Sequence, residues 1–533
     1  MVCTTEGRRI CASKNREGSQ TERSVKSSTS RPSVEDSASA RDGSAAKKKS
    51  KMPDVSGHRS QQKHSSACRS SRTSLLGHGD CDQKFKFSVT RQRSRKSKDF
   101  EKMAVRATIL AWLVDTGTVQ ENAEVYSMDE TTGQMKNRGI LKIDGILCFC
   151  CNKIFSVPNF HLHGGRSCKK PYKNIFISDT NVPLLSYMAE AWNEPGESES
   201  HRFNAVEARG DIYDDACMVC ADGGNLMCCE KCSSTYHQVC LGMENVPEDS
   251  WYCPYCVCKF CLKPSHENDF LIICPQCDKR YHWECHRMIE QRMDLNSIPV
   301  PPFCDQSCKE VFDKLTKSML GKQMDLGEGY SWTLLHRIDD DEEFNIYIGE
   351  NEDYNYWRTM CNSKLVVARR LMEACFEPIK DRHTRVKIIP SVVYNCRSNF
   401  RRVSYGGFYS AVLEKDDEII CVASLRVHGR SLAEMPFIAT HEDYRCRGMC
   451  AKLMAAIQSG LCDMRVKNLV IPSVPEKSKN WISGHGFLYS DKAKMRTRAR
   501  TDMTNVIEDQ IRAHSTVMFH DSVRLHKPIM PSQ

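Results

Sequence analysis

The chain has 533 residues, enough for two to four domains, and its apolar content of 40% and mean hydropathy of −0.51 are typical of a soluble protein. Its best apolar run, ATILAWLV at 107–114, is far shorter than the roughly 18 residues that a membrane-spanning helix needs, and the first residues lack the apolar core of a secretory signal. These features exclude membrane and secreted proteins from our expectations and favour an intracellular one. Residues 1–100 hold 23 Lys and Arg against 10 Asp and Glu, whereas the whole chain carries only +9, so the basic excess lies in this segment.

The basic segment 1–100 is rich in Ser, Lys and Arg and has little apolar periodicity. Such a composition buries too little surface to offset chain entropy, so we expect a disordered tail. Its two basic clusters, 47–51 (KKKSK) and 91–98 (RQRSRKSK), have the composition of nuclear-import signals or of nucleic-acid contacts. A solvated charged tail without either role is an equally good interpretation.

A second region, 101–200, is expected to contain a helix around Ala104–Val114 and then a compact block over 139–192. Short alternating apolar runs separated by Gly turns predict a small β-rich unit in this block. Its cysteines and one histidine are candidates for a further zinc site, although their spacing does not define one, and buried cysteines are the alternative: Cys148, Cys150, Cys151, His163 and Cys168. Lys169, Lys170 and Lys173 are candidates for contacts with DNA phosphates.

The cysteines are concentrated in residues 217–308, which hold 15 of the 30. In a reducing compartment, cysteines at this density with interleaved histidines indicate metal sites rather than disulfides. A first array is predicted in a domain spanning 212–257, with the ligands Cys217, Cys220, Cys229, Cys232, His237, Cys240, Cys253 and Cys256. A second array follows at 258–310, with the ligands Cys258, Cys261, Cys274, Cys277, His282, Cys285, Cys304 and Cys308.

Both arrays suit tetrahedral Zn²⁺, with structural rather than catalytic ions. The first array, with His as the fifth ligand and Trp251 before the last pair, resembles a PHD finger, whereas a RING domain has its His fourth. The resemblance implies two Zn²⁺ per finger with interleaved ligand pairs, and implies that the finger reads histone tails. Asp214, Asp215 and Asp222 surround the first ligand pair and are candidates for binding an unmodified histone H3 tail, and a scaffold finger with solvated acids is the alternative.

Residues 325–515 show strands and helices in alternation, which predicts one mixed α/β domain followed by a tail at 516–533. Residues 364–379 place apolar side chains on one helical face. Strands are expected at 407–414, 418–427, 434–440 and 468–474, with a charged turn at 415–417, and a helix is expected at 448–462.

The loop between strand 434–440 and the next helix resembles the Gln/Arg-x-x-Gly-x-Gly/Ala motif of GNAT-type N-acetyltransferases. Backbone N–H groups at a helix N-terminus bind a pyrophosphate, so acetyl-CoA is the expected cosubstrate. The loop residues predicted to bind it are Arg445, Cys446, Arg447, Gly448, Met449 and Cys450. Transfer to lysine requires a general base, because free lysine has a pKa near ~10.4. By resemblance this base is Glu434, whose pKa we expect burial to raise, and an acyl-carrying Cys446 or Cys450 is a much weaker alternative.

Several stretches together resemble the plant PHD-finger acetyltransferases of the Increased DNA Methylation type, among them 146–151 (ILCFCC), 251–261 (WYCPYCVCKFC) and 445–454 (RCRGMCAKLM). The resemblance covers about Met103 to Glu508. It implies a multidomain nuclear histone lysine N-acetyltransferase that acts in transcription and against silencing, with histone tails, DNA and other chromatin proteins as partners, and a Jas-like, Tify-associated DNA-binding unit at 139–192. The alternative is a non-catalytic chromatin reader with a degenerate acetyltransferase domain. A ubiquitin ligase is a distant third.

Overall fold

The computed structural model describes residues 9–10, 106–165, 170–207, 210–265, 270–290, 302–339, 353–490 and 501–529. The chain divides into two compact units, Met1–Ala12 with Gln83–Gln533, and Ser13–Asp82, and every described residue belongs to the first. The basic tail predicted for 1–100 and the candidate ligand Cys168 therefore lie outside the described residues, apart from a two-residue strand β1 (Arg9–Ile10) that pairs with β8. Across the described ranges, no helix is both long and apolar enough to cross a bilayer.

The β-rich unit predicted for 139–192 is present and begins earlier than expected, at Glu124. Its six-stranded sheet has, in spatial order, β5 (Ile154–Phe155), β4 (Gly145–Cys148), β3 (Met135–Lys142), β2 (Glu124–Met128), β6 (Ile175–Ile177) and β7 (Val182–Pro183). Its helices are α2 (Val157–His163), α3 (Pro171–Asn174), α4 (Leu184–Asn193) and α5 (Pro195–Ser198). The helix predicted from Ala104 is α1 (Ile109–Asp115), which Thr108 caps by accepting a bond from the Ala111 N–H.

The zinc-ligand region contains short elements only, as expected for a region with too little apolar core of its own. The first array holds β8 (Leu226–Cys228) and β9 (Thr235–Tyr236). The second holds β10 (Ile272–Ile273), β11 (Arg280–Tyr281), α6 (Trp283–Glu290) and α7 (Gln306–Asp313).

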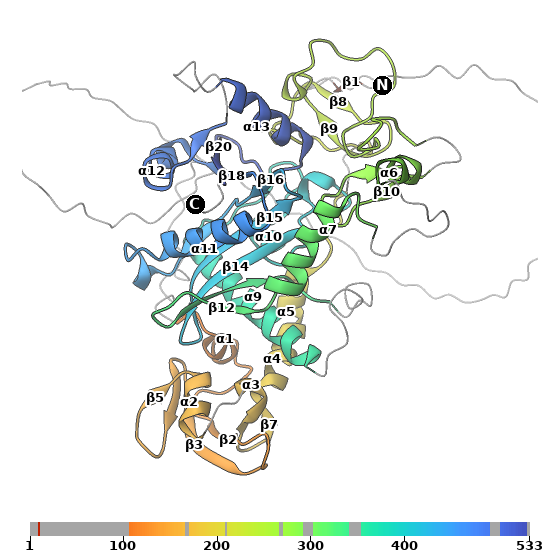
Figure 1. Ribbon diagram of the computed structural model, residues 1–533. Helices are drawn as coiled ribbons and strands as arrows, with labels where there is room; N and C mark the ends of the chain where they lie inside the picture. Colours follow the sequence, from red (N-terminus) through yellow and green to blue (C-terminus); the bar gives the residue numbers. More distant parts are fainter. Residues whose placement is uncertain are drawn as a thin grey trace, which may run out of the picture. The chain divides into compact units, whose positions relative to one another are not determined.

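The α/β domain is built on a nine-stranded sheet, and Figure 1 shows its central strands β14 and β15 between helices. Its strands are, in spatial order, β12 (Gln323–Asp325), β13 (Tyr330–Leu335), β14 (Phe408–Lys415), β15 (Glu418–His428), β16 (Leu432–Glu434), β18 (Asn468–Ser473), β20 (Val523–Pro528) and β19 (Leu488–Tyr489), with β17 (Ile438–Thr440) also paired to β15. Its helices are α9 (Tyr354–Cys375), α10 (Ile388–Val393), α11 (Met449–Asp463), α12 (Pro475–His485) and α13 (Thr501–Ala513).

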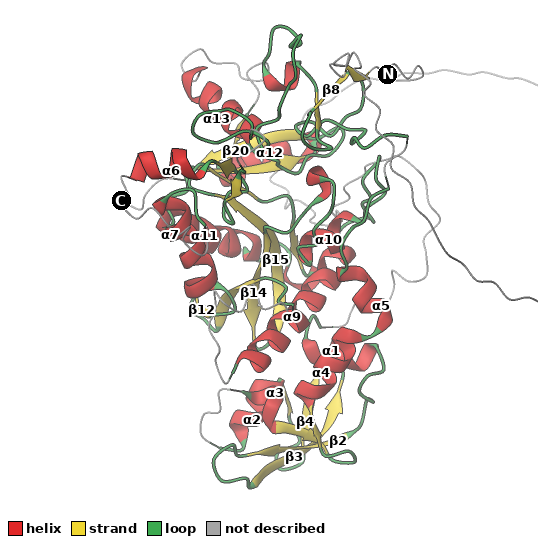
Figure 2. Cartoon of the chain, turned by 90° about the vertical axis from the view of Figure 1, so that its right-hand side faces the viewer, coloured by secondary structure: helices red, strands yellow, loops and turns green. Residues whose placement is uncertain are grey.

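Alternating side chains of β14 enter two different cores. Phe408 and Val412 pack with α9 and α10, whereas Ala411 and Leu413 pack with α11. The two-residue periodicity of a strand sends successive side chains to opposite faces, so α9 and α11 cover opposite faces of the sheet. The core on the α9 face also contains buried residues of the β-rich unit, and α9 contacts α1 and α4, as Figure 2 shows.

Two sequence expectations about this sheet are wrong. Residues 434–440 do not form one strand, because Pro436 lacks the N–H that a sheet interior requires, and the segment has one residue more than the facing stretch of β15. This bulge separates β16, which pairs with β18, from β17, which does not. The predicted tail 516–533 contains β20, which lies between β18 and β19 inside the sheet, so the domain does not end at 515.

Candidate functional site

The structure brings the sixteen predicted zinc ligands into four groups of four, whose ligand atoms lie within 4.8 Å of one another in each group. In tetrahedral zinc with Zn–S bonds of about 2.3 Å, neighbouring sulfurs are about 3.8 Å apart. The Sγ–Sγ distances agree with this value, at 3.7 Å for Cys232 and Cys253 and 3.6 Å for Cys277 and Cys304. The chemistry and spacing of these groups fit structural Zn²⁺, and the pairs interleave as the PHD resemblance implies: Cys217, Cys220, His237 and Cys240; Cys229, Cys232, Cys253 and Cys256; Cys258, Cys261, His282 and Cys285; Cys274, Cys277, Cys304 and Cys308.

The histidine of the first finger is oriented by a second contact. His237 places Nδ1 3.7 Å from the Cys240 sulfur, and its Nε2 lies 3.1 Å from the Gly223 carbonyl oxygen. The carbonyl accepts from Nε2–H, which leaves the Nδ1 lone pair for a metal.

The irregular final pair of the second array has a local structural reason. Asp305 is the N-cap of α7 and accepts a hydrogen bond of 2.8 Å from the Cys308 N–H. The last ligand therefore lies in the first turn of a helix, whereas Cys304 precedes the N-cap. The capped turn between them, with three intervening residues, brings the two sulfurs to 3.6 Å.

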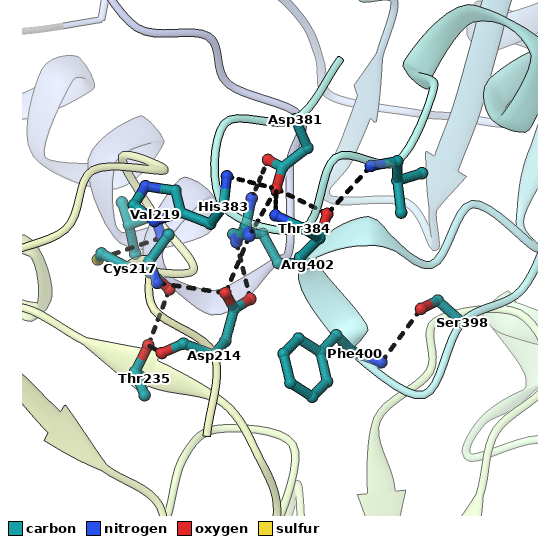
Figure 3. A network of polar contacts seen from close by, with 12 residues as sticks. Asp214, Cys217, Val219, Thr235, Asp381, His383, Thr384, Ser398, Phe400 and Arg402 are labelled. Carbon is teal, nitrogen blue, oxygen red and sulfur yellow. Dashed lines mark hydrogen bonds and ion pairs between the residues drawn. The ribbon is translucent and has the colours of Figure 1, made fainter. Parts of the chain in front are cut away.

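Asp214 does not face solvent, which contradicts its predicted role in binding a histone tail. It is 1% exposed and accepts hydrogen bonds of 2.8 and 2.9 Å from the Nε and Nη2 of Arg402. Figure 3 shows the same guanidinium contacting Asp381, whose carboxylate also accepts from the Thr384 N–H. Burial would raise the pKa of Asp381, but the bonds from Arg402 outweigh it and lower the pKa to about 2. Asp214 therefore fixes the first finger to the α/β domain.

The other two acidic candidates of the finger remain accessible. Asp215 is half-buried, and the Asp222 side chain is 46% exposed, with a carboxylate oxygen 2.9 Å from the His520 Nδ1. An acidic surface in the first finger therefore consists of Asp215 and Asp222 without Asp214.

Glu434, the predicted base, is the last residue of β16 and is 1% exposed. One carboxylate oxygen lies 2.5 Å from the Arg426 Nε and 2.9 Å from the His428 Nε2, and the other accepts a bond of 2.7 Å from the Val517 N–H. Burial alone would raise the pKa of Glu434, but the charge of Arg426 and the bond from His428 outweigh it, and the pKa is lowered. The expectation of a raised pKa is therefore wrong in this arrangement.

A four-residue segment between α13 and β20 covers Glu434. His514, Ser515, Thr516 and Val517 are all buried. The Ser515 N–H donates to the Tyr255 hydroxyl of the first finger at 2.5 Å, and the Ser515 carbonyl accepts from Arg426. The zinc finger and the carboxylate are therefore linked through this covering segment.

His428, which contacts Glu434, packs against a second buried histidine, His514. The His428 and His514 rings are 4.8 Å apart, and burial lowers the pKa of both, so both are neutral at physiological pH. His428 therefore donates its Nε2–H to Glu434 as a neutral ring.

The predicted pyrophosphate loop precedes α11. Gly448 is the N-cap of this 15-residue helix and has a φ of 79°, and Cys446 has a φ of 59°. A Cβ built on Gly448 would meet no atom within 4 Å, so the backbone there faces open space. The first N–H groups of an α-helix have no partner within the helix, and the helix dipole favours an anion at this end. The loop thus has the features of an anion-binding site.

The side chains of the loop differ in their contacts. The Arg445 Nε donates to the Thr440 carbonyl at 3.2 Å, and its Nη2 lies 3.5 Å from the Cys375 sulfur, so this guanidinium braces the loop against β17 and α9. Arg447 is exposed and lies over the Tyr444 ring. Burial raises the pKa of the Cys450 thiol to about 11, which disfavours a nucleophilic thiolate at neutral pH.

A cavity of about 260 Å³ adjoins the loop. Three cationic side chains, two carboxylates and two aromatic rings line it: Arg106, Tyr330, Lys415, Asp416, Glu418, Tyr444 and Arg447. The cations exceed the carboxylates by one.

Sequence reasoning missed the partners that control Glu434. Arg426 and His428 lie in β15, whose buried apolar run they interrupt at alternate positions, so both point to one face. Polar residues at a period of two within a buried strand are the signal that could have identified them.

Comparison with known families gives three matches. Residues 139–191 match the Tify domain binding domain, residues 217–256 match the PHD-finger, and residues 376–528 match the Increased DNA methylation 1, C-terminal domain. The chain is thus a multidomain PHD-finger protein with a Tify-binding domain and Cys/His clusters for zinc.

The protein Increased DNA methylation 1 of Arabidopsis thaliana is 36% identical over 386 residues, which cover 71% of this chain and 32% of that protein. The chain spans about a third of the length of this curated relative. With its C-terminal domain match, the chain fits the plant Increased DNA methylation 1 family, as the sequence resemblance implied.

Two solved structures show weak similarity to parts of the chain. Tetrahymena GCN5 is 14% identical with a TM-score of 0.23, over 32% of this chain and 88% of that chain. N-acetylglutamate synthase from Neisseria gonorrhoeae, complexed with coenzyme A and N-acetyl-glutamate, is 16% identical with a TM-score of 0.17, over 24% of this chain and 26% of that chain.

Proposed function

We propose that this chain is a nuclear histone lysine N-acetyltransferase that uses acetyl-CoA and acts in transcription and anti-silencing. The observation that carries the proposal is the loop Arg445–Cys450, in which Gly448 is the N-cap of α11. The loop begins eleven residues after Glu434, a buried carboxylate at the bulge between β16 and β17. The similarity to Increased DNA methylation 1 and the PHD-finger match support a role in chromatin.

In this proposal backbone N–H groups of the loop Arg445–Cys450 hold the pyrophosphate of acetyl-CoA, except that of Arg445, which donates to the Glu442 carbonyl. The positive φ of Gly448 and the open space beside it are the features that support this role, because a side chain there would be strained and would fill the approach. Arg445 stiffens the loop through its contacts with Thr440 and Cys375. The exposed Arg447, which also lines the adjoining cavity, supplies positive charge for the remaining phosphate of the nucleotide.

The proposed reaction is direct transfer. The lysine nitrogen attacks the thioester carbonyl carbon, the carbon–sulfur bond breaks, and the CoA thiolate takes up a proton. Glu434 accepts the proton that leaves the amine. Val517 and Ser515 hold the covering segment over Glu434 and Arg426, so we infer that this segment withdraws before substrate enters, which removes one donor from the carboxylate and makes it more basic.

The fingers would present the histone. Asp215 and Asp222 provide an acidic surface for an unmodified tail, and Asp214 fixes that surface to the α/β domain through Arg402. The Tify-binding domain and the basic segment 1–100 would hold DNA and other chromatin proteins.

Incubating the purified, zinc-loaded chain with acetyl-CoA and core histones tests the proposal. Mass spectrometry should find new acetyl-lysine that depends on both the protein and acetyl-CoA. Absence of acetylation on core histones and on nucleosomes, with zinc content and fold intact, would refute it.

A second candidate function is a non-catalytic chromatin reader. The specific observation in its favour is the sealed, ion-paired state of Glu434 beneath His514–Val517. A reader would bind H3 peptides in calorimetry and show no turnover even when the covering segment is loosened by Ser515→Pro, which removes the N–H that Tyr255 accepts.

A further inference from the structure

We propose a fifth zinc site in the Tify-binding domain, formed by Cys148, Cys150, Cys151 and His163. Their four ligand atoms lie within 4.8 Å of one another, the same limit that the four finger sites meet. The Cys150 sulfur is 3.2 Å from the Cys148 sulfur and 3.0 Å from the His163 Nε2. Three thiolates and one imidazole are a common ligand set of structural Zn²⁺.

The backbone around Cys148 has the conformation of the zinc-binding turns in the fingers. The Asn152 N–H donates to the Cys148 carbonyl, and the Cys148 N–H donates to the Lys153 carbonyl, both at 2.9 Å. If Cys148 is residue i, the N–H of i+4 donates to the carbonyl of i, and the N–H of i donates to the carbonyl of i+5. The same two bonds, at 2.8 to 3.0 Å, close the turns that start at the finger ligands Cys217, Cys258 and Cys274.

The match extends to the dihedral angles. The residue at i+4 is left-handed in all four turns, with a φ of 53° at Asn152 and of 62°, 60° and 57° at Ala221, Leu262 and Asp278. In the finger turns the second ligand is at i+3, which corresponds to Cys151. The additional Cys150 hides this Cys-x-x-Cys pair in the sequence.

The structure also selects between the two histidines of α2. His161 is buried, and its Nδ1 lies 2.6 Å from the Ser127 hydroxyl, so it belongs to the core. His163 ends the helix, and its ring stacks on Phe155 of β5 at 4.7 Å, with Nε2 directed at Cys150. Stacking fixes the ring as a ligand requires.

A disulfide does not account for this cluster. The Cys148–Cys150 separation of 3.2 Å is well beyond the roughly 2.05 Å of a sulfur–sulfur bond, and all three thiols are free. Apolar packing does not account for it either, because the neighbouring side chains Phe149, Ile154 and Leu162 are 48 to 50% exposed. A metal ion would tie the two-residue edge strand β5 and the helix α2 to β4 where the apolar core is thin.

The metal content of the 533-residue chain tests the inference. The chain purified in zinc-replete medium and dialysed should contain five Zn²⁺ per molecule by elemental analysis, four in the fingers and one at this site. His163→Ala and Cys150→Ser should each lose one ion. Leu162→Ala is the matched control, since Leu162 precedes His163 and is equally accessible, and it should retain five.

Hydrogen exchange shows at which site the zinc ion is lost. In His163→Ala, hydrogen exchange of the β4–β5 and α2 amides should accelerate at least about tenfold, while the finger amides keep their protection. Four ions in the wild-type chain with all four finger sites filled, or five ions in both ligand variants, would overturn the proposal. The result does not depend on whether the chain transfers acetyl groups.

Discussion

Removing the charge of Arg402 should release the first zinc finger from the α/β domain. This guanidinium is the counterion of two carboxylates, and the side chains of Arg402, Asp214 and Asp381 are only 7%, 2% and 10% exposed. Arg402→Met preserves the length of the side chain but leaves both carboxylates buried, unpaired and facing each other. Breaking a buried ion pair by removing one partner costs about 3–5 kcal/mol.

This cost would raise the population of molecules with an undocked finger by roughly 100- to 1000-fold or more, since each 1.4 kcal/mol is a factor of ten. Hydrogen exchange by mass spectrometry should show reduced amide protection in the finger segment that contains Asp214 and in the segment that contains Asp381. The zinc content should stay unchanged. Arg382→Met is the matched control, because Arg382 is exposed in the same stretch, and it should change protection by less than about 0.5 kcal/mol.

A triple variant distinguishes the effect of the unpaired buried charges from the effect of the changed side-chain shape. Asp214→Asn, Asp381→Asn and Arg402→Met together leave no buried charge in the network and should recover much of the lost protection. A fall in protection of less than about fivefold in Arg402→Met alone would refute the reasoning, because the carboxylates would then be solvated or paired elsewhere.

Three further predictions concern the loop, the carboxylate and the zinc ligands. Gly448→Asp should abolish acetyl-CoA binding in calorimetry, because it adds strain at a positive φ and a negative charge beside the pyrophosphate. The control Gly484→Asp, in open space on α12, should leave the affinity unchanged. Equal affinities of the two variants would contradict the loop assignment. Glu434→Gln should keep acetyl-CoA affinity and lower turnover by about 100-fold or more, and undiminished turnover would show that Glu434 is not the base. Cys304→Ser should lose one zinc ion by elemental analysis. The control Cys228→Ser should lose none, because Cys228 is next to a ligand but belongs to none of the clusters found among the described residues. If Cys304→Ser retained its ion, Cys304 would not be a zinc ligand.

The chemical components of the sites could be predicted from the sequence, because they depend on residue type and local spacing. Sixteen cysteines and histidines follow the order of two zinc-binding arrays, and the structure groups them accordingly. Gly448 between a strand and an apolar helix indicated a loop at a helix N-terminus, and the structure has the glycine at the N-cap. The hairpin at 415–417 has two residues, Asp416 and Asp417, at positive φ, as a tight turn between paired strands requires.

The roles of charged residues could not be predicted in this way, because they depend on partners distant in the chain. Asp214 has the same local sequence context as Asp215, yet only Asp214 meets Arg402, 188 residues further on. Glu434 was expected to have a raised pKa from its strand alone, and the arrangement of Arg426, His428 and Val517 lowers it. The sign of a pKa shift reflects the sum of burial and nearby charges, and the sequence provides only the first.

By itself, the sequence determined which elements this protein has: zinc-binding arrays, a β-rich unit, and a mixed α/β domain with a loop suited to pyrophosphate. These follow from side-chain chemistry and from periodicities of a few residues. Only the tertiary structure decided that β20 lies inside the sheet, that the segment His514–Val517 covers Glu434, and that the Cys148 turn has the geometry of a zinc-binding turn. These features are contacts between residues that are distant in the sequence or backbone angles that no composition encodes, and they are fixed when the whole chain packs.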